Sequence, residues 1–497
     1  MGLTPAVGSS DSDFLARLKI DLQGFLTNSR SQWETIVPFT QSHTSKPASN
    51  ACISLSLCEG SLFTFSYKPG KKRTVRLLRV LYRSDDEEDS DRCMIIFKVA
   101  CACQGCQGSQ GSRSHGECEY DWAGKNLVLK LRSSAMEDRS RMPEQKQVMD
   151  LCRDLAVDEH AWVLNHLPRT YCSFELPPII WTSQIQNHYS KKKWTSGMVL
   201  RRTRGMIEDE LKPVEDLRSE REFAQVYFDV VQCHHWVYTY LKILHRDINR
   251  KNIMFREKDG EKYGVLNNWN SSLRLHDADK SKDSENLPPS RSRTSPGNPY
   301  LAHEQHHRLW KGPYRYRHDL ESLFYVILYQ TCLYSSPRAE MCTDRIPGDD
   351  QLGNWFYTDD QDLYISKHSL IYSHRWEPPV KPFFSSFSSW LLHMNIRLFD
   401  GLYARTKYKF DNGEIPRAPK FGIPWPIPVV VQGTDKTAFD EDTLGGEFSY
   451  DEVVIAMHLF NDQPLEIRGN EWQQRLAWLR EEADRKYYAE AVRAANV

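Results

Sequence analysis

The chain has 497 residues, of which 40% are hydrophobic and 26% charged, so it can bury a large core and global disorder is excluded. Lys and Arg number 65 against 66 Asp and Glu, which gives no reason to expect nucleic acid or an anionic membrane as partner. No apolar run is long enough to cross a bilayer, and the first residues lack the pattern of a secretory signal. The 12 cysteines are scattered, so we expect an intracellular protein, cytoplasmic or nuclear. The length fits two to four folded units, or one large domain with extensions.

Residues 1–50 are rich in Ser, Thr and Gln and contain one amphipathic stretch. The apolar residues that recur there at helical spacing are Phe14, Leu15, Leu18, Leu22 and Phe25. This spacing predicts a helix that packs on the rest of the protein, with a partner-binding helix as the alternative.

Residues 54–83 alternate apolar and polar side chains and are rich in β-formers, which predicts strands, and residues 93–101 and 125–132 predict two more. The loop between the last two is rich in Gly, Ser and Gln. It also carries the residue types and local spacing of a small zinc site, namely Cys103, Cys106, His115 and Cys118. A flexible insertion between strands is the preferred interpretation.

The rest of the chain is mainly helical, beginning with apolar-periodic stretches over 144–167 and 220–243. A charged amphipathic stretch near the end predicts a last helix. This order predicts four regions: an N-terminal segment over 1–50, a β-rich region over 51–211, a mainly helical region over 212–465 and a C-terminal helix over 466–497.

The motif "HRDINRKN" contains Asp247, preceded by His245 and Arg246 and followed five residues later by Asn252. Phosphoryl transfer in protein kinases needs these residue types at this spacing. The Asp accepts or orients the proton of the substrate hydroxyl, and the Asn coordinates magnesium. The motif follows an apolar helix and precedes a short strand, as that chemistry requires. A polar helix cap between two apolar elements is the alternative.

A lysine in a predicted strand, Lys130, is suited to pairing the α- and β-phosphates of ATP. The alternative is a solvated lysine at a sheet edge. We expect Glu159, in the helical stretch that follows, to be the carboxylate that pairs with Lys130. Glu144 and Asp158 are the rival partners.

Two further segments fit nucleotide binding. "MIEDEL", residues 206–211, falls where an adenine-binding hinge runs, and we assign Glu208 and Leu211 to it. "PGKKRTVRLLRV" is the best match to a glycine-rich phosphate loop, with Gly70 and Thr74 retained. Lys and Arg at 72 and 73 stand near a position that requires glycine, so a basic β-turn is an equal alternative.

Two further residues are assigned structural roles. Glu304 in "YLAHE" stands where the Ala-Pro-Glu pattern closes an activation segment. Asp319 begins an apolar stretch, "LESLFYVILY", and we expect it to hold the Asp247 loop from the start of a buried helix.

The strings "ILHRDINRKNIM", "YGVLNNWNSS", "RYRHDLESLFYVILY" and "TLGGEFSYDE" together resemble the fungal-type protein kinase family, over about residues 127–460. The resemblance implies an α+β, two-lobed protein-kinase-like fold, with a small β-rich N-lobe and a larger, mainly helical C-lobe. It also implies ATP and Mg²⁺ as ligands and Ser/Thr of a protein as substrate. It names no particular substrate or partner, and the oligomeric state stays open.

The chain departs from the family at Asn268 and Asn270, where aspartates are usual. Mg²⁺ prefers charged oxygen ligands, so an amide at Asn268, the expected second metal residue, removes a Coulomb term. A loss of this type lowers the rate on the order of 100- to 1000-fold. Asp277 and Asp279 lie too far along the chain to be expected substitutes.

Three functions remain open at this stage. They are an impaired Ser/Thr protein kinase, a pseudokinase that acts as a binding or scaffold protein, and a small-molecule phosphotransferase. The protein-kinase-like "RHDLESLFYVILY" argues against the third. Residues 279–299 form the predicted activation loop, where phosphorylation of a serine or threonine near arginines would order the chain.

Overall fold

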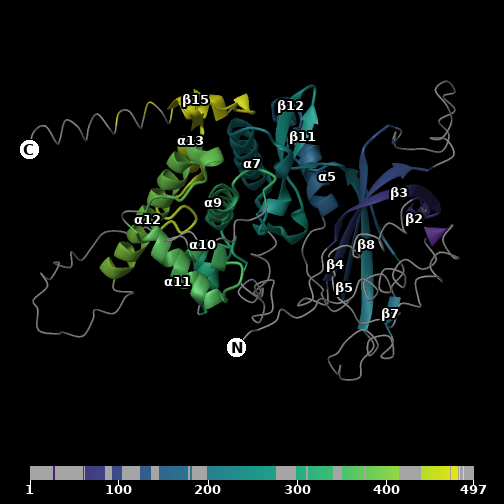
Figure 1. The fold of residues 1–497 in the computed structure, drawn as a ribbon, viewed down its shortest axis with the longest axis horizontal. Coiled ribbons are helices and arrows are strands. Elements are labelled where there is room, and N and C mark those ends of the chain that lie inside the picture. Colours follow the sequence, from purple (N-terminus) through teal and green to yellow (C-terminus); the bar gives the residue numbers. More distant parts are fainter. Residues whose placement is uncertain are drawn as a thin grey trace, which may run out of the picture. The chain divides into compact units, whose positions relative to one another are not determined.

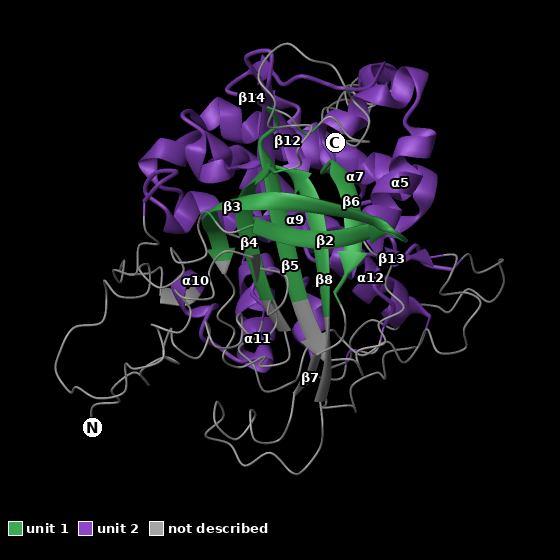
Figure 2. Cartoon of the chain, turned by 90° about the vertical axis from the view of Figure 1, so that its right-hand side faces the viewer, with its two compact units in different colours: residues 1–141, 168–210 green, residues 142–167, 211–497 purple. Residues whose placement is uncertain are grey.

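The structure is a computed structural model. It describes residues 26–27, 60, 62–83, 92–102, 122, 124–135, 145–176, 179–181, 199–275, 298–308, 310, 312–339, 350–373, 376–412, 438–470, 472–478, 481 and 485. The chain forms two compact units, coloured separately in Figure 2. Unit 1 comprises residues 1–141 and 168–210, and unit 2 comprises residues 142–167 and 211–497. The predicted helical stretch 144–167 therefore belongs with unit 2, although the sequence grouped it with the β-rich region.

Unit 1 is built on one 8-stranded antiparallel sheet with strand order β1-β2-β3-β4-β5-β8-β6, in which β7 also pairs with β8. Its strands are β1 (Leu26–Thr27), β2 (Leu62–Lys68), β3 (Lys71–Arg83), β4 (Arg92–Cys101), β5 (Leu127–Ala135), β6 (Thr170–Glu175), β7 (Ile179–Trp181) and β8 (Val199–Asp209). The strands predicted over 93–101 and 125–132 are confirmed, as is the part of 54–83 that the structure describes.

The core of unit 1 follows from the alternation of the strands, because every second side chain points to the same face. Phe63 and Phe65 of β2 are buried there, and the Phe65 ring stacks on Phe174 of β6 with centroids 4.0 Å apart. Gly205 of β8 makes room for that ring, since a Cβ at this position would lie 2.1 Å from Phe174. The glycine is thus required by packing rather than by a turn.

Unit 2 contains the following helices: α5 (Gln145–Leu155), α7 (Glu220–Leu241), α9 (Tyr316–Leu333), α10 (Asp350–Asn354), α11 (Asp360–Ile371), α12 (Ser388–Asp411) and α13 (Tyr450–Met457). Its short 3₁₀ helices are η2 (Asp158–Asn165), η3 (Val214–Asp216), η4 (Arg250–Asn252), η5 (Trp269–Ser271), η7 (His303–His306) and η8 (Pro382–Phe387). Its small sheets are β12-β11-β9, β10-β13 and β14-β15. These strands are β9 (Lys212–Pro213), β10 (Ile243–Leu244), β11 (Ile253–Lys258), β12 (Glu261–Leu266), β13 (Leu273–Arg274), β14 (Leu459–Phe460) and β15 (Gln463–Pro464). The mixture of sheet and helix confirms the α+β class. Figure 1 labels many of the elements of both units.

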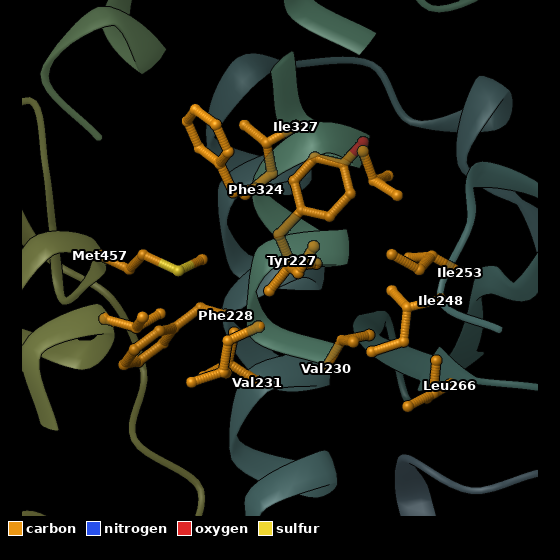
Figure 3. Packing of buried hydrophobic residues seen from close by; sticks show 14 of the residues in the cluster. Tyr227, Phe228, Val230, Val231, Ile248, Ile253, Leu266, Phe324, Ile327 and Met457 are labelled. Atoms are coloured by element: carbon orange, nitrogen blue, oxygen red, sulfur yellow. The ribbon is translucent and has the colours of Figure 1, made fainter. Parts of the chain in front are cut away.

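Helices α7 and α9 form the centre of unit 2. Ser219 caps α7 by accepting a hydrogen bond from the Glu222 N–H, and Lys242 ends the helix in the left-handed region with φ 54°. Every residue of α9 is buried, as expected for a helix that other elements surround on all sides. Figure 3 shows Tyr227 and Phe228 of α7 in the same cluster as Phe324 of α9.

Strand β12 packs closely on α7 because it has a glycine at the contact. A Cβ on Gly264 would lie 2.3 Å from the Val226 carbonyl oxygen in the middle of α7. The Gly264 N–H also donates to the Asp229 carboxylate at 2.9 Å. This contact fixes the strand that leads into residues 267–270.

Several predicted features lie outside the described residues: the N-terminal helix, the four zinc-type residues and most of residues 279–299. Residues 472–478 are helical, within the predicted C-terminal helix. Within the part of the chain that the structure describes, no helix combines the length and the apolar character needed to cross a membrane.

Candidate active site

Asp247 lies on the loop between β10 and η4 and is surrounded by amide side chains. Its Oδ1 accepts a hydrogen bond from Asn249 Nδ2 at 2.8 Å. Its Oδ2 accepts from Asn252 Nδ2 at 3.0 Å and from Asn268 Nδ2 at 3.4 Å. The structure thus brings together three residues that the sequence singled out, Asp247, Asn252 and Asn268.

Asn249 explains the local shape of this loop. Its side-chain oxygen caps η4 by accepting from the backbone N–H groups of Lys251 and Asn252. Asn is a favoured cap because its short side chain reaches its own backbone two to three residues on. The same side chain donates to Asp247, so one residue both starts the helix and orients the carboxylate.

The loop is held in place by Asp319, which lies in the first turn of α9 and is fully buried. Its carboxylate accepts from the backbone N–H of His245 at 2.8 Å and from that of Arg246 at 2.9 Å. His234 Nε2 and the Tyr314 hydroxyl bond the same carboxylate. Burial by itself would raise the pKa of Asp319, but these partners, His234 first, hold it at about 2.

His245 links this anchor to the segment after β12. Its Nδ1 accepts from the Asp247 N–H at 3.2 Å, and its Nε2 lies 2.9 Å from the Asn267 carbonyl oxygen. A ring that accepts at one nitrogen and donates at the other is neutral. Burial lowers the pKa of His245 to about 4, which agrees with the neutral form at pH 7.

Side-chain amides make several of the hydrogen bonds that hold the segment Asn267–Asn270. Asn268 is left-handed, with φ 65°, a conformation that Asn tolerates better than most residues. Its N–H donates to Asn267 Oδ1 at 2.8 Å, and its own Oδ1 accepts from Asn270 Nδ2 at 3.0 Å. The side-chain oxygen of Asn268, the residue expected at a metal position, is therefore already bonded within the segment.

Sequence reasoning missed Gln145, the first residue of α5, which is fully buried. Its Oε1 accepts from the Trp269 N–H at 3.2 Å, and its own N–H donates to Asn270 Oδ1 at 3.3 Å. Both bonds fix the Asn268 segment from the end of a helix. The only sequence signal is a polar residue at the start of an amphipathic helix, which is too common to single it out.

Asn252 and Asn268 offer a divalent cation fewer charged ligands than the same site would with an aspartate at position 268. The carbonyl of Asn268 is bonded to Asn270, and its Nδ2 faces Asp247. Asn252 also turns its Nδ2 to Asp247, which leaves its carbonyl as a neutral ligand. Among the described residues, no group of three or more His, Cys, Asp or Glu residues is placed to hold a metal ion. Mg²⁺ prefers charged oxygens, and neither Asn252 nor Asn268 supplies one.

The predicted nucleotide residues of unit 1 lie in its sheet. Lys130 is buried, which rules out the solvated edge lysine, and its Nζ pairs with Glu208 at 3.1 Å. Lys130 stands opposite Met206 and Glu208 opposite Val128, so the two charges are diagonal neighbours across β5 and β8. Glu208 also accepts from the Thr170 hydroxyl at 2.9 Å. The predicted hinge residue is thus the partner of the predicted phosphate lysine.

The glycine-loop candidate is the hairpin between β2 and β3. Gly70 occupies the turn with φ 75°, where glycine carries no steric cost. The Thr74 hydroxyl bonds that of Thr64 across the two strands at 2.9 Å.

The other residues that the sequence assigned to nucleotide binding, Glu159 and Leu211, belong to unit 2. Glu159 is exposed on η2, a 3₁₀ helix and not the predicted α-helix. Its rival Asp158 is also exposed, with φ 49°, and Glu144 lies outside the described residues. Leu211 is buried at the first position after the boundary between the units. The pairing of Glu159 with Lys130 stays a prediction.

Glu304 lies in η7 and is held by three cationic or imidazole groups. It accepts from Arg317 and His318 at 2.6 Å each and from Arg405 at 2.7 Å. Burial would raise its pKa, but His318 and the two arginines hold the pKa of Glu304 well below its usual value. This network fixes the end of the predicted activation segment on α9 and α12.

Arg246 is mostly buried beside Tyr314, with the guanidinium carbon 5.5 Å from the ring centre. Burial lowers the pKa of Arg246, although Tyr314 and Asp319 oppose this. Asp277 and Asp279, the candidates for metal rescue, lie outside the described residues.

Comparison with curated proteins found no match. Among solved structures, the chain is similar to the PK-1 kinase of Cydia pomonella granulovirus, at 10% identity over 65% of this chain and 86% of the viral one. The TM-score is 0.33, which is too low to establish a shared fold. A family model described as "Fungal protein kinase" matches residues 110–331, which include Lys130, the Asp247 loop and Asp319. The resemblance to the fungal-type protein kinase family that the motifs predicted is thus confirmed over residues 110–331.

Proposed function

We propose that this chain is a protein-kinase-like protein with the two-lobed kinase fold, and that it binds ATP. We further propose that it transfers phosphate to Ser or Thr of a protein substrate at a strongly reduced rate. The observation that carries the proposal is the ordered Asp247 loop. Asp247 is oriented by Asn249 and Asn252, and its loop is anchored by Asp319. An oriented carboxylate is what the acceptor hydroxyl requires.

In this proposal ATP supplies the phosphoryl group, and the residues of the chain position the reactants. Asp247 takes up the hydroxyl proton of the substrate. Lys130 is the residue suited to the α- and β-phosphates, but it is already paired with Glu208 at 3.1 Å. The phosphates must therefore compete with a buried carboxylate, which weakens nucleotide binding. Asn268 supplies no negative charge for a metal, which weakens phosphoryl transfer.

A pseudokinase that serves as a binding or scaffold protein is the second candidate. The amide cluster favours it, because Asn268 bonds both Asp247 and Asn270. This cluster satisfies its own hydrogen bonds without a cation. In such a protein the Asp247 loop and Asp319 would serve the stability of the helical core alone.

A phosphotransfer assay with radiolabelled ATP and Mg²⁺ on a general Ser/Thr protein substrate separates the two candidates. The wild type, Asn268→Asp and Asp247→Asn are compared at equal folded concentration. An impaired kinase gives a wild-type rate above that of Asp247→Asn, and Asn268→Asp raises it on the order of 100-fold. If the wild type equals Asp247→Asn and Asn268→Asp gains nothing, catalysis is rejected and the scaffold function stands.

We also assign the protein to the cytoplasm or nucleus. The 12 cysteines are scattered along the sequence, which fits a reducing compartment better than a disulfide framework. The balanced charge of the chain gives no reason to expect a nucleic acid as partner.

A further inference from the structure

Helix α12 carries a row of exposed apolar side chains. Leu392, Ile396, Tyr403 and Phe410 are 43%, 48%, 59% and 43% exposed. They are spaced by four, seven and seven residues, so they lie along one stripe of the helix. The partly buried Phe399 lies on the same stripe, and its ring contacts Tyr403 with centroids 6.2 Å apart. We call these five residues the α12 stripe.

Apart from Phe399, whose ring also contacts Tyr372 with centroids 5.3 Å apart, the stripe is separate from the face with which α12 packs inside unit 2. That inner face consists of Trp390, Leu391, Met394, Leu398 and Leu402, all buried. It lies against α13 and α9, and Figure 1 shows α12 beside α13 and α11. Single exposed apolar residues are normal on a protein surface. A second apolar row on a helix whose first row already packs in the core is not explained by folding of this unit.

The spacing of the stripe is that of a helix–helix seam. Ile396, Tyr403 and Phe410 occupy one heptad position, and Leu392 and Phe399 the other. At 1.5 Å per residue, the stripe runs for about 27 Å along the helix axis. This length covers more than two heptads, enough for one face of a two-helix contact.

The charges beside the stripe favour a second copy of the same chain. Asp400 and Lys407 lie on one flank of the stripe, seven residues apart. In a two-fold symmetric pair the helices run antiparallel and the same flank faces itself. Asp400 of each copy then lies near Lys407 of the other, which gives two reciprocal ion pairs.

Asp400 is also poorly neutralised within its own unit. It pairs with Arg397 at 4.0 Å, and this arginine also pairs with Glu447 and Glu452 at 3.1 Å each. Burial, aided by Glu447, raises the pKa of Asp400. A lysine from a second copy would give Asp400 a second cation, one that is not shared with Glu447 and Glu452, so the surface is self-complementary in charge as well as apolar.

We propose that this protein forms a homodimer through the α12 stripe, with the two α12 helices antiparallel and Asp400 of each copy paired with Lys407 of the other. The contact joins residues of unit 2 alone. It lies outside the Asp247 loop and does not depend on whether the protein is a catalyst.

Sedimentation equilibrium of the full chain over a range of concentrations tests the proposal. The wild type should show a reversible monomer–dimer equilibrium. Tyr403→Lys should abolish it, because the substitution buries a charge in the centre of the seam. Tyr357→Lys is the matched control, since Tyr357 is 74% exposed but lies outside α12, and it should dimerise like the wild type. Circular dichroism and thermal unfolding verify that each variant is folded.

Charge reversal tests the antiparallel pairing itself. Asp400→Lys and Lys407→Asp should each weaken the homodimer by about tenfold, because like charges then face each other twice. A mixture of the two variants should recover the dimer, since each copy then meets the opposite charge. A wild-type monomer at every concentration overturns the proposal. So does a dimer that survives Tyr403→Lys, or a mixture of charge variants that stays as weak as either alone.

Discussion

The Asp247 loop and the Asn267–Asn270 segment lie side by side in unit 2 but are stabilised differently. The loop is fixed by a buried, ionised carboxylate, Asp319, that accepts two backbone N–H groups. The segment is fixed by neutral amides, and its Asn268 approaches Asp247 at 3.4 Å. A buried charge therefore supports the loop, whereas Asn268 supplies no charge to the neighbouring segment. Two adjacent segments of one unit are thus stabilised by different kinds of polar group.

The largest expected effect is that of removing the charge of the anchor. Asp319→Asn replaces one acceptor oxygen with a donor that faces N–H groups, and should lower the free energy of unfolding by about 3–5 kcal/mol. Chemical denaturation with urea measures this loss. Asp362→Asn, at an exposed position of α11, is the control and should change stability by less than about 0.5 kcal/mol. Equal stability of the two variants would show that the loop does not depend on Asp319.

The second effect is the dependence of stability on pH through His245. Burial holds its pKa at about 4 in the folded protein, below the ordinary value of 6.5, with Asp319 and His234 as facing groups. Between these values the unfolded chain binds a proton that the folded chain does not, so stability is lost as the pH falls from 6.5 to 4. At about 1.4 kcal/mol per pKa unit, this effect of His245 lowers the free energy of unfolding by about 3 kcal/mol over the whole interval.

Urea unfolding at pH 7 and at pH 5 measures that loss, and His245→Gln supplies the comparison. His235 and His306 also have pKa values lowered by burial, to about 3 and about 4, so the variant should keep part of the pH dependence. The variant should nevertheless lose less stability than the wild type over this interval. If His245→Gln and the wild type lose the same stability between pH 7 and pH 5, then His245 does not cause the pH dependence.

The third effect concerns the amide segment. Asn268→Asp places a second carboxylate beside Asp247. Without metal this should lower the free energy of unfolding by about 2 kcal/mol, because nearby like charges repel. Mg²⁺ in excess should restore that stability, since it neutralises both carboxylates. Thermal unfolding with EDTA and with Mg²⁺ measures this, with the wild type as the control that should respond little to Mg²⁺. A variant that ignores Mg²⁺ would contradict the view that charge is what the segment lacks.

The smallest effect tests the support that α5 gives to the same segment. Gln145→Ala removes the acceptor of the buried Trp269 N–H and should lower stability by about 1 kcal/mol. Gln147→Ala, on the exposed face of α5, is the matched control. If Gln145→Ala unfolds no more easily than Gln147→Ala, then α5 does not fix the segment.

The motif residues of unit 2 were predictable because their roles depend on residues that are close together in the chain. "HRDINRKN" fixes the order of a short loop, and the apolar stretch after Asp319 can only be a buried helix. Gln145 could not be predicted, because 124 residues separate it from Trp269. The same holds for Arg405, which lies 101 residues from Glu304. Such contacts arise from packing between distant elements and leave no periodic signal.

The sequence by itself determined strands β2 to β5, the Asp247 motif and the absence of a carboxylate at Asn268, since each follows from residue type and spacing, and the family resemblance implied the α+β class. Only the tertiary structure decided that Lys130 is buried against Glu208, that Asn268 bonds Asp247, and that α12 has a second apolar face. The physical reason is that strand register, loop closure and helix packing determine which side chains meet, and none of these is encoded by neighbours in the chain.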